Sequence, residues 1–302
     1  MAILIEKTTR VLVQGVTGKE GGFHTQRMLE YGTNIVAGVT PYKGGQMFHG
    51  IPVFNTVQEA INTVGHVDAS VIFVPSKMAS SSICEACMAG IKLIVVVTEG
   101  IPQHDMLKVH YYLRKYDCMM VGPNCPGLAT AGQAKIGIIP NNVLEPGIVG
   151  LVSRSGTISY EILKLLKDSG LGQTTVVGLG GDPLIGLRFK DLLSMFLQDN
   201  QTQAVVMVGE IGGNDEEEAS IVVKKLVENN KPVIAFIAGR NAPEGKRMGH
   251  AGAIIMGKSG KPEYKIQKLK EAGAIVVDTI NTIPKIILQE LSKVNTNIGG
   301  GE

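Results

Sequence analysis

One histidine late in the chain is set among unusually small residues. It lies in the stretch Gly245-Lys246-Arg247-Met248-Gly249-His250-Ala251-Gly252-Ala253. A neutral imidazole nitrogen is nucleophilic near pH 7, and a small-residue loop suits a nucleophile that must reach its partner. A surface or hydrogen-bonded structural role is the alternative interpretation. The other histidines lack such a setting and are expected to be structural: His24, His49, His66, His104 and His110.

A glycine-rich turn near the start of the chain has the pattern of an anion-binding site. The segment Gly15-Val16-Thr17-Gly18-Lys19-Glu20-Gly21-Gly22 follows an expected strand and leads into an expected helix. Glycines let the backbone approach an anion closely, and a helix start supplies N–H donors and the positive end of the helix dipole. The turn predicts a phosphorylated, nucleotide-like ligand, with a purely structural turn as the alternative.

Two departures from the dinucleotide fingerprint argue against NAD at this turn. Thr17 replaces the middle glycine of G-x-G-x-x-G, and the second strand ends at Val39-Thr40-Pro41 without a carboxylate to bind the ribose 2′-hydroxyl. Lys43 follows that strand instead. A cation in this region suits a ligand that carries more phosphate charge.

A second turn of interest, Ser153-Arg154-Ser155-Gly156-Thr157, lies between an expected strand and an expected helix. It is not a hydrolase nucleophile elbow, because Ser153 stands where G-x-S-x-G requires glycine. Ser155, Gly156 and Thr157 fit a helix start whose hydroxyl and amides hold an anion. An ordinary N-cap is the alternative.

The segment from Gly252 to Ser259 matches the Walker A pattern G-x-x-x-x-G-K-S letter for letter. We interpret the match as accidental. A true motif follows a strand and opens a helix at its lysine, whereas here the His250 loop precedes it and Pro262 soon follows. Its interior, from Ala253 to Met256, is also unusually apolar for a phosphate cradle.

Alternating strands and helices are expected to position these segments. The first half contains short β-branched runs at 10–14, 34–39, 69–74, 92–97 and, more weakly, 118–122. In the second half, strands near 148–153, 174–177, 204–208, 233–237 and 274–277 alternate with helices near 157–168, 187–197, 216–228, 263–271 and 283–292. This alternation predicts parallel βαβ units with helices covering both faces of each sheet.

Length and composition favour a two-domain globular protein. A chain of 302 residues suits two cores, and proline and glycine between 122 and 150 mark the boundary. The expected division is 1–125, a connection at 126–147, and 148–302. A net charge of +2 gives no broad basic field for nucleic acid or an anionic membrane. The longest apolar runs fall far short of the roughly 20 residues of a membrane span.

Neither a metal site nor a targeting segment is expected. Cys84 and Cys87 form a C-x-x-C pair inside an expected helix, with no second pair to complete a zinc site. Together with Cys118 and Cys125 they are interpreted as small buried thiols of a reducing compartment. No signal sequence or transit peptide is expected, since strand-forming residues begin almost at once.

Four motifs together resemble one family. They are Gly-Pro-Asn-Cys-Pro-Gly at 122–127, Ser-Arg-Ser-Gly-Thr at 153–157, Gly-Glu-Ile-Gly-Gly at 209–213 and the His250 segment at 245–253. In order and spacing, over nearly the whole chain, they are similar to the α subunit of succinyl-CoA synthetase. The resemblance implies an α/β protein with a Rossmann-like CoA-binding domain followed by a flavodoxin-like ligase domain, both with mainly parallel sheets.

The resemblance also implies roles for individual residues. His250 matches the phosphorylated nucleophile, Glu210 its carboxylate partner, and Tyr160 a neighbour of the carboxylic acid substrate. Glu210 suits this role because it follows the strand at 204–208, at the carboxyl end where α/β sites gather. Phosphohistidine 250 is expected to rest on the helix start at Ser155–Thr157. The positions implied to contact CoA are Thr17, Gly18, Lys19, Glu20, Lys43, Val97, Thr98 and Glu99, of which Lys19 and Glu20 occupy variable places in the turn.

The implied reaction is reversible and needs a second chain. Phosphate attacks succinyl-CoA, succinyl phosphate phosphorylates His250, and the phosphohistidine transfers its group to ADP or GDP. The nucleotide and its Mg²⁺ are expected on a β subunit similar to ATP-grasp proteins. A malate–CoA ligase, an NDP-forming acetyl-CoA synthetase or a CoA- or NAD-binding regulatory module stay open, as does a heterodimer against a larger assembly. The expected location is the cytoplasm of a bacterium or archaeon, or a mitochondrial matrix or related organelle.

Overall fold

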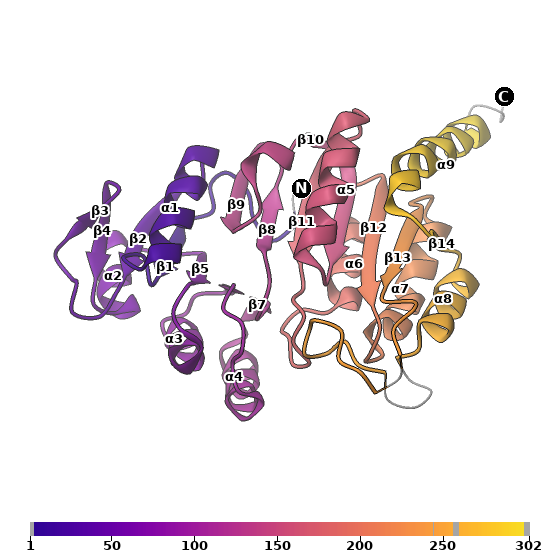
Figure 1. Cartoon of the computed structure of the whole chain (residues 1–302). Helices are drawn as coiled ribbons and strands as arrows, with labels where there is room; N and C mark the ends of the chain where they lie inside the picture. Colours follow the sequence, from indigo (N-terminus) through magenta and orange to yellow (C-terminus); the bar gives the residue numbers. More distant parts are fainter. Residues whose placement is uncertain (1–2, 244, 256–259, 299–302) are drawn as a thin grey trace. The chain divides into compact units, whose positions relative to one another are not determined.

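The computed structural model describes residues 3–243, 245–255 and 260–298 and divides into two compact units (Figure 1). The N-terminal unit comprises residues 4–141 and 178–187, and the C-terminal unit comprises 1–3, 142–177 and 188–302. Each unit is described by itself below. The expected boundaries at 125 and 147 stay a prediction.

The N-terminal unit contains a mainly parallel sheet with helices on both faces. Its elements are β1 (Val11–Gln14), α1 (Lys19–Tyr31), β2 (Ile35–Val39), β3 (Met47–Phe48), β4 (Ile51–Phe54), α2 (Val57–Val64), β5 (Ala69–Ile72), α3 (Ser76–Met88), β6 (Leu93–Val96), α4 (Gln103–Tyr116), β7 (Met119–Val121), β8 (Gly127–Thr130) and β9 (Ala134–Gly137). The sheet has the order β3-β4-β2-β1-β5-β6-β7. From β4 to β7 this is the Rossmann order 3-2-1-4-5-6, whose direction reverses between β1 and β5.

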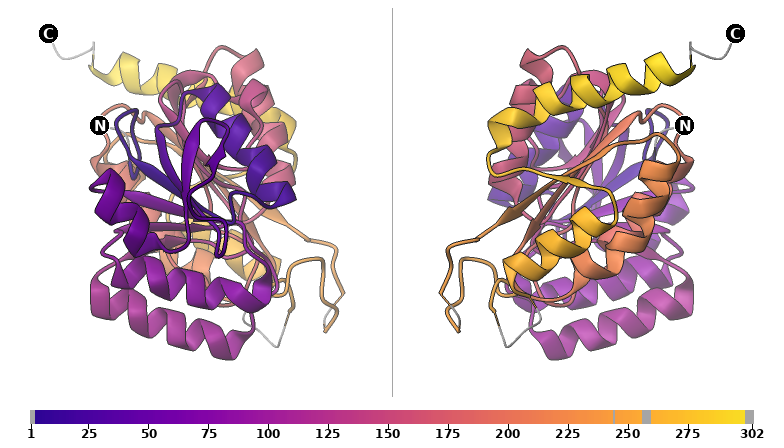
Figure 2. Two further views of the ribbon diagram at one scale, coloured as in Figure 1. Left: turned by 90° about the vertical axis from the view of Figure 1, so that its left-hand side faces the viewer. Right: turned by 90° about the vertical axis from the view of Figure 1, so that its right-hand side faces the viewer.

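The apolar strands of this unit are covered as their sequences predict. β1 is buried along its whole length, as expected for a central parallel strand. Helices α2, α3 and α4 share one hydrophobic core that includes Val57, Ile83 and Val109. Helix α1 lies on the other side of the sheet from α3 and α4 (Figure 2). It ends at Gly32, whose φ of 95° is the left-handed conformation that favours glycine at a helix end.

Strands β8 and β9 form an antiparallel hairpin inside the proline- and glycine-rich stretch where the sequence predicts interrupted structure. Lys135 of β9 is buried, and its Nζ donates to the carbonyl oxygen of Ile139 at 2.8 Å and to Oδ1 of Asn141 at 2.6 Å. Burial lowers the pKa of this amine from 10.5 to about 8. Pairing between these two neighbouring strands therefore orders a stretch in which composition alone predicts a break.

The C-terminal unit has a second, mainly parallel sheet. Its elements are a 3-10 turn at Asn141–Val143 that starts at the unit boundary, β10 (Pro146–Ser153), α5 (Gly156–Asp168), β11 (Gln173–Gly178), α6 (Phe189–Gln198), β12 (Ala204–Glu210), α7 (Asp215–Glu228), β13 (Val233–Ala238), α8 (Pro262–Glu271), β14 (Ile275–Val276), a 3-10 turn at Ile280–Thr282 and α9 (Ile283–Ile298). The order β14-β13-β12-β10-β11 is flavodoxin-like, with its reversal between β10 and β12.

Helix periodicity explains how this second sheet is covered. In α6 the buried residues are Phe189, Leu192, Leu193 and Phe196, a spacing that places one apolar stripe against the sheet. Helices α7 and α8 lie on one side of the sheet, and α5 and α9 lie on the other (Figure 2). Within the described ranges, no helix combines the length and apolar character needed to cross a membrane.

Candidate active site

His250 and Glu210 meet in the C-terminal unit although 40 residues separate them in the sequence. Nδ1 of His250 lies 2.7 Å from Oε2 of Glu210, a hydrogen-bond distance. The histidine side chain is 30% exposed and the glutamate side chain 10% exposed. The ring can therefore be reached from outside, while the carboxylate beside it is largely removed from water.

Strand β12 positions Glu210 at its carboxyl end. All residues of the strand are buried, and Glu210 is its last residue. β12 pairs in parallel with β10, so that Ser153 lies opposite Val208 and both strands end at the same edge of the sheet. The order in which successive strands are added to the sheet reverses between these two parallel strands. In open α/β sheets, ligands bind at such a switch point.

The His250 loop is held by its own backbone and by glycine contacts. The amide of Met248 donates to the carbonyl of Ala253 at 2.9 Å, which closes the loop around the histidine. A Cβ atom on Gly212 would lie 2.2 Å from the carbonyl oxygen of Gly252, so the turn after β12 must be glycine here for the loop to approach. This close packing holds His250 beside the end of β12.

Helix α5 begins just after β10, the strand that pairs with β12 and therefore neighbours Glu210. Ser155 is the N-cap, and its hydroxyl oxygen accepts from the amide of Ile158 at 3.3 Å. Gly156 and Thr157 open the helix, where the first amides have no carbonyl partner within the helix. Ser155 thus acts as an N-cap, which leaves the backbone amides as the donors that suit an anion. Tyr160 is half-buried in the same helix, and its contact with a carboxylic acid stays a prediction.

A buried cluster of charges beneath this site was not foreseen from the sequence. Nζ of Lys265 forms an ion pair with Oε2 of Glu216 and another, at 2.9 Å, with Oε2 of Glu217. Asp215 is paired with Arg188 at 2.8 Å and Arg154 at 3.1 Å. Burial raises the pKa of Asp215, and the two guanidinium groups oppose that rise. The acidic run at the start of α7 was the available signal, but such runs usually mark a solvated face.

In the N-terminal unit, the glycine-rich turn is closely packed. Gly15 has a φ of 84°, and the amide of Gly18 donates to its carbonyl oxygen at 3.0 Å. A Cβ on Gly21 would come within 2.1 Å of that same oxygen. Helix α1 then begins at Lys19, with Gly18, Lys19 and Glu20 exposed. These contacts bring the helix start directly onto the end of β1.

The other positions expected to contact CoA follow the carboxyl ends of neighbouring strands in this unit. Thr17 Oγ1 and Thr40 Oγ1 are 3.1 Å apart, which joins the β1 turn to the end of β2, and Lys43 is exposed three residues later. Val97, Thr98 and Glu99 follow β6, and Thr98 Oγ1 donates to the carbonyl of Val74 at 2.7 Å. The predicted set therefore shares one edge of the sheet.

Comparison with known proteins finds a family model in each half of the chain. Residues 6–100 match the family model described as the CoA binding domain, and residues 152–277 match the model described as CoA-ligase. The α 1 subunit of an ADP-forming succinate–CoA ligase from Archaeoglobus fulgidus is 51% identical over 96% of this chain and 99% of its own length. The corresponding subunit from Aquifex aeolicus is 54% identical over 92% of this chain and 91% of its own length.

The chain belongs to the family of succinate–CoA ligase α subunits. Among solved structures, the chain is similar to parts of larger enzymes. ATP citrate lyase from Methanothrix soehngenii matches with a TM-score of 0.87 and 25% identity over 98% of the chain and 51% of its own length. An acetyl-coenzyme A synthetase from Ca. Korarchaeum cryptofilum shares the fold with a TM-score of 0.74 and 22% identity over 90% of the chain and 58% of its own length. The chain thus spans about half the length of these solved proteins.

The Walker A match in this family member lacks the surrounding elements of a nucleotide-binding loop. Strand β13 ends at Ala238 and helix α8 begins only at Pro262. Ala253 and Ile255 are buried with Ile211, so the first half of the match is apolar core. Met256, Gly257, Lys258 and Ser259 lie outside the described residues. The observed neighbours support an accidental match, which stays a prediction.

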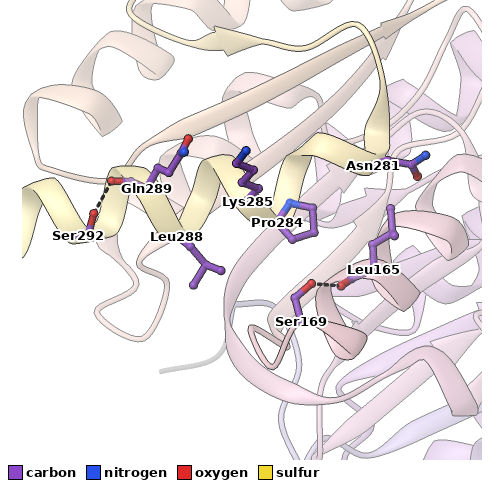
Figure 3. Close-up of a pocket in the computed structure, with 8 residues that line it drawn as sticks. All are labelled: Leu165, Ser169, Asn281, Pro284, Lys285, Leu288, Gln289 and Ser292. Atoms are coloured by element: carbon purple, nitrogen blue, oxygen red, sulfur yellow. Dashed lines mark hydrogen bonds between the residues drawn. The ribbon is translucent and has the colours of Figure 1, made fainter.

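Metal-binding groups and surface pockets are two other kinds of ligand site. Among the described residues, no group of three or more His, Cys, Asp or Glu side chains is arranged to hold a metal ion. A shallow pocket of about 520 Å³ lies between the last turns of α5, near Leu165 and Ser169, and the side of α9 that carries Pro284 and Leu288 (Figure 3). It lies at the opposite end of α5 from Ser155 and is not part of the His250 site.

Proposed function

We propose that this chain is the CoA-binding, phosphohistidine-carrying α subunit of an ADP-forming succinate–CoA ligase. The observation that supports the mechanism most directly is the 2.7 Å contact between His250 Nδ1 and Glu210 Oε2. A proton on Nδ1 donates to this carboxylate, which assigns phosphoryl transfer to Nε2. The carboxylate also stabilises the positive charge that the ring acquires as it attacks.

In this mechanism inorganic phosphate displaces CoA from succinyl-CoA to give succinyl phosphate. Nε2 of His250 then attacks the phosphorus and releases succinate, and ADP takes the phosphoryl group from the histidine to form ATP. The α5 start at Ser155, Gly156 and Thr157 is proposed to bind the phosphoryl group by backbone amides and the helix dipole. Tyr160, in the same helix, is proposed to border the succinate site.

CoA is assigned to the N-terminal unit. Thr17, Gly18, Lys19 and Glu20 lie in the turn after β1, Lys43 follows β2, and Val97, Thr98 and Glu99 follow β6. Support comes from the CoA binding domain match at 6–100 and from the end of β2, where Thr40 and Pro41 stand in place of a ribose-binding carboxylate. Calorimetry on the purified chain should show CoA binding. Tight NAD binding without CoA binding would contradict this assignment.

A separate β subunit is proposed to bind ADP and Mg²⁺, because no described segment of this chain forms a credible ATP cradle. The names of the bacterial and archaeal relatives as α subunits support this division. A bacterial or archaeal enzyme would act in the cytoplasm, and a processed eukaryotic one in the mitochondrial matrix or a related organelle.

The decisive experiment is incubation of the chain and a matching β subunit with γ-labelled ATP, followed by mapping of the labelled residue. We expect the label on His250 and none in His250→Ala. Lys258→Ala with Ser259→Ala should retain most synthetase activity, since these residues belong to the accidental Walker match. Succinyl-CoA synthesis by the purified chain alone would overturn the two-subunit proposal. Rates with malate and acetate in place of succinate test the related ligases.

A further inference from the structure

Glu216 contacts the backbone of Glu210, the partner of His250, and each of its two carboxylate oxygens lies beside a cation. It stands in the first turn of α7 and is fully buried, as is Lys265, whose ammonium group contacts Oε2 of Glu216. Nε of Arg154 lies 3.7 Å from the other oxygen, Oε1. A buried carboxylate held by two cations at the positive end of a helix has little freedom to move.

The same Oε1 oxygen accepts a hydrogen bond from the backbone N–H of Glu210 at 3.1 Å. Gly209, the residue before Glu210 in β12, leaves room for this contact. A Cβ on Gly209 would lie 2.6 Å from Cγ of Glu216 and 2.7 Å from its Oε1, so the carboxylate occupies the space that a side chain at 209 would need. Glu216 thus contacts the backbone of Glu210 at the point where β12 ends.

We propose that Glu216 is a positioning residue for phosphoryl transfer. It fixes the backbone of Glu210, so that the Glu210 side chain meets Nδ1 of His250, while Lys265 and Arg154 hold Glu216 in place. This inference rests on the proposed function of His250. It differs from a purely structural ion cluster in one respect: the acceptor at Oε1, and not the buried charge, is what the reaction requires.

Two matched double variants separate the acceptor from the charge. Glu216→Gln with Lys265→Met removes both buried charges but keeps an oxygen that can accept from Glu210 N–H. Glu216→Leu with Lys265→Met removes the same charges and the acceptor. Because an unsatisfied buried N–H is costly, we expect His250 phosphorylation, with the β subunit and ATP, to be at least about 10-fold slower in the leucine variant and within about 3-fold of wild type in the glutamine variant.

A spectroscopic measurement tests positioning without any turnover. Ring ¹⁵N shifts of His250 in the full chain report which nitrogen carries the proton. We expect the Nδ1–H tautomer to dominate in wild type and in the glutamine variant, and a mixture of tautomers in the leucine variant. Glu218→Gln is the control, because Glu218 lies in the same turn of α7 and pairs with Arg188 at 2.8 Å. It should leave both the tautomer and the rate unchanged.

A third comparison uses Glu210→Gln as the background. If Glu216 acts through Glu210, adding Glu216→Leu and Lys265→Met to Glu210→Gln should slow phosphorylation little further, because the effects of residues that act as one unit are not additive.

Equal rates and equal tautomers in the glutamine and leucine double variants would overturn the inference. If either pair fails to fold, single Glu216→Gln and Glu216→Leu give the same contrast, since Lys265 keeps its pair with Glu217. Absence of label on wild-type His250 would instead refute the proposed function, and the tautomer measurement would still judge the role of Glu216.

Discussion

Helices α1 and α7 both begin where a parallel strand ends and both lack a side-chain cap, but their first turns differ in charge and exposure. The first turn of α1 has one carboxylate, Glu20, and Gly18, Lys19 and Glu20 are exposed. The first turn of α7 carries the carboxylates of Asp215–Glu218, and Asp215 and Glu216 are buried. One helix start is open to an anion from outside, whereas the other is filled by the protein's own carboxylates.

The buried lysines of the two units follow the same contrast. Lys135 in the N-terminal unit is held by neutral oxygens of Ile139 and Asn141. Lys265 in the C-terminal unit is held by the carboxylates of Glu216 and Glu217. The exposed first turn of α1 thus leaves its donors available to a ligand, whereas the first turn of α7 has its buried carboxylates neutralised by cations of the same unit.

Glu210→Gln should have the largest effect, because it removes a charge that the C-terminal unit places beside the reacting ring. We expect phosphorylation of His250 to slow by about 10²-fold or more, as for a positioned catalytic group, without unfolding. Labelling by γ-labelled ATP in the complex with β measures the rate, and thermal melting measures the fold. An unchanged rate would mean that a different carboxylate orients His250.

Ser155→Asp tests whether α5 resembles α1 in receiving an anion. Aspartate caps a helix as well as serine does, so the fold should persist, but its charge should repel the phosphoryl group at the amides. We expect the steady-state level of phosphohistidine to fall roughly 10-fold, a loss that corresponds to about 1.4 kcal/mol. Ser155→Asn is the matched neutral cap and should keep the wild-type level. A normal level in the aspartate variant would remove α5 from the mechanism.

Gly21→Ala should damage the open turn alone. The added methyl group would meet the carbonyl oxygen of Gly15 at 2.1 Å, so the helix start must move away from β1. We expect CoA affinity to fall about five-fold by calorimetry, since crowding of this kind costs about 1 kcal/mol or more. Phosphorylation of His250 by ATP and β serves as the internal control and should not change. Unaltered CoA binding would place the ligand away from this turn.

Lys135→Met should have the smallest effect, and only on stability against pH. The pKa of Lys135 is about 8 in the folded chain and near 10.5 when unfolded, so the unfolded state binds more protons between these values. The wild type should therefore gain about 1 kcal/mol of unfolding free energy relative to the variant from pH 7 to pH 9. Urea unfolding at both pH values measures this difference. A constant difference would mean that Lys135 keeps its proton throughout.

The sequence was sufficient for most of the parallel strands and for the place of Glu210 at the end of one of them. Alternating apolar runs predicted these strands, but the short strands β3 and β4 were not foreseen, and the position of Glu210 just after a strand predicted its place at the sheet edge. Periodicity and turn chemistry are local properties, so they can be read without knowledge of the fold. The hairpin of β8 and β9 was missed because its pairing outweighs the proline and glycine around it.

The supporting charges could not be predicted for a physical reason. Lys265 and Glu216 are 49 residues apart, and each belongs to a helix that also carries exposed charged residues, such as Lys224 in α7 and Glu263 in α8. No local pattern distinguishes a buried lysine or glutamate from an exposed one. Arg154 appeared in the sequence only as part of a turn motif, while its ion pair with Asp215 depends on strands β10 and β12 being neighbours.

The presence of glycine at position 209, directly before Glu210, has a consequence for protein engineering. A designer who grafts a histidine and a glutamate onto another flavodoxin-like sheet could reproduce their 2.7 Å contact on paper and still obtain an imprecise pair. The graft would also need a glycine before the glutamate, a second glutamate six residues after it, and a cation from a later helix. The smallest transferable piece of this site is therefore a strand end, the first turn of the next helix and one distant lysine.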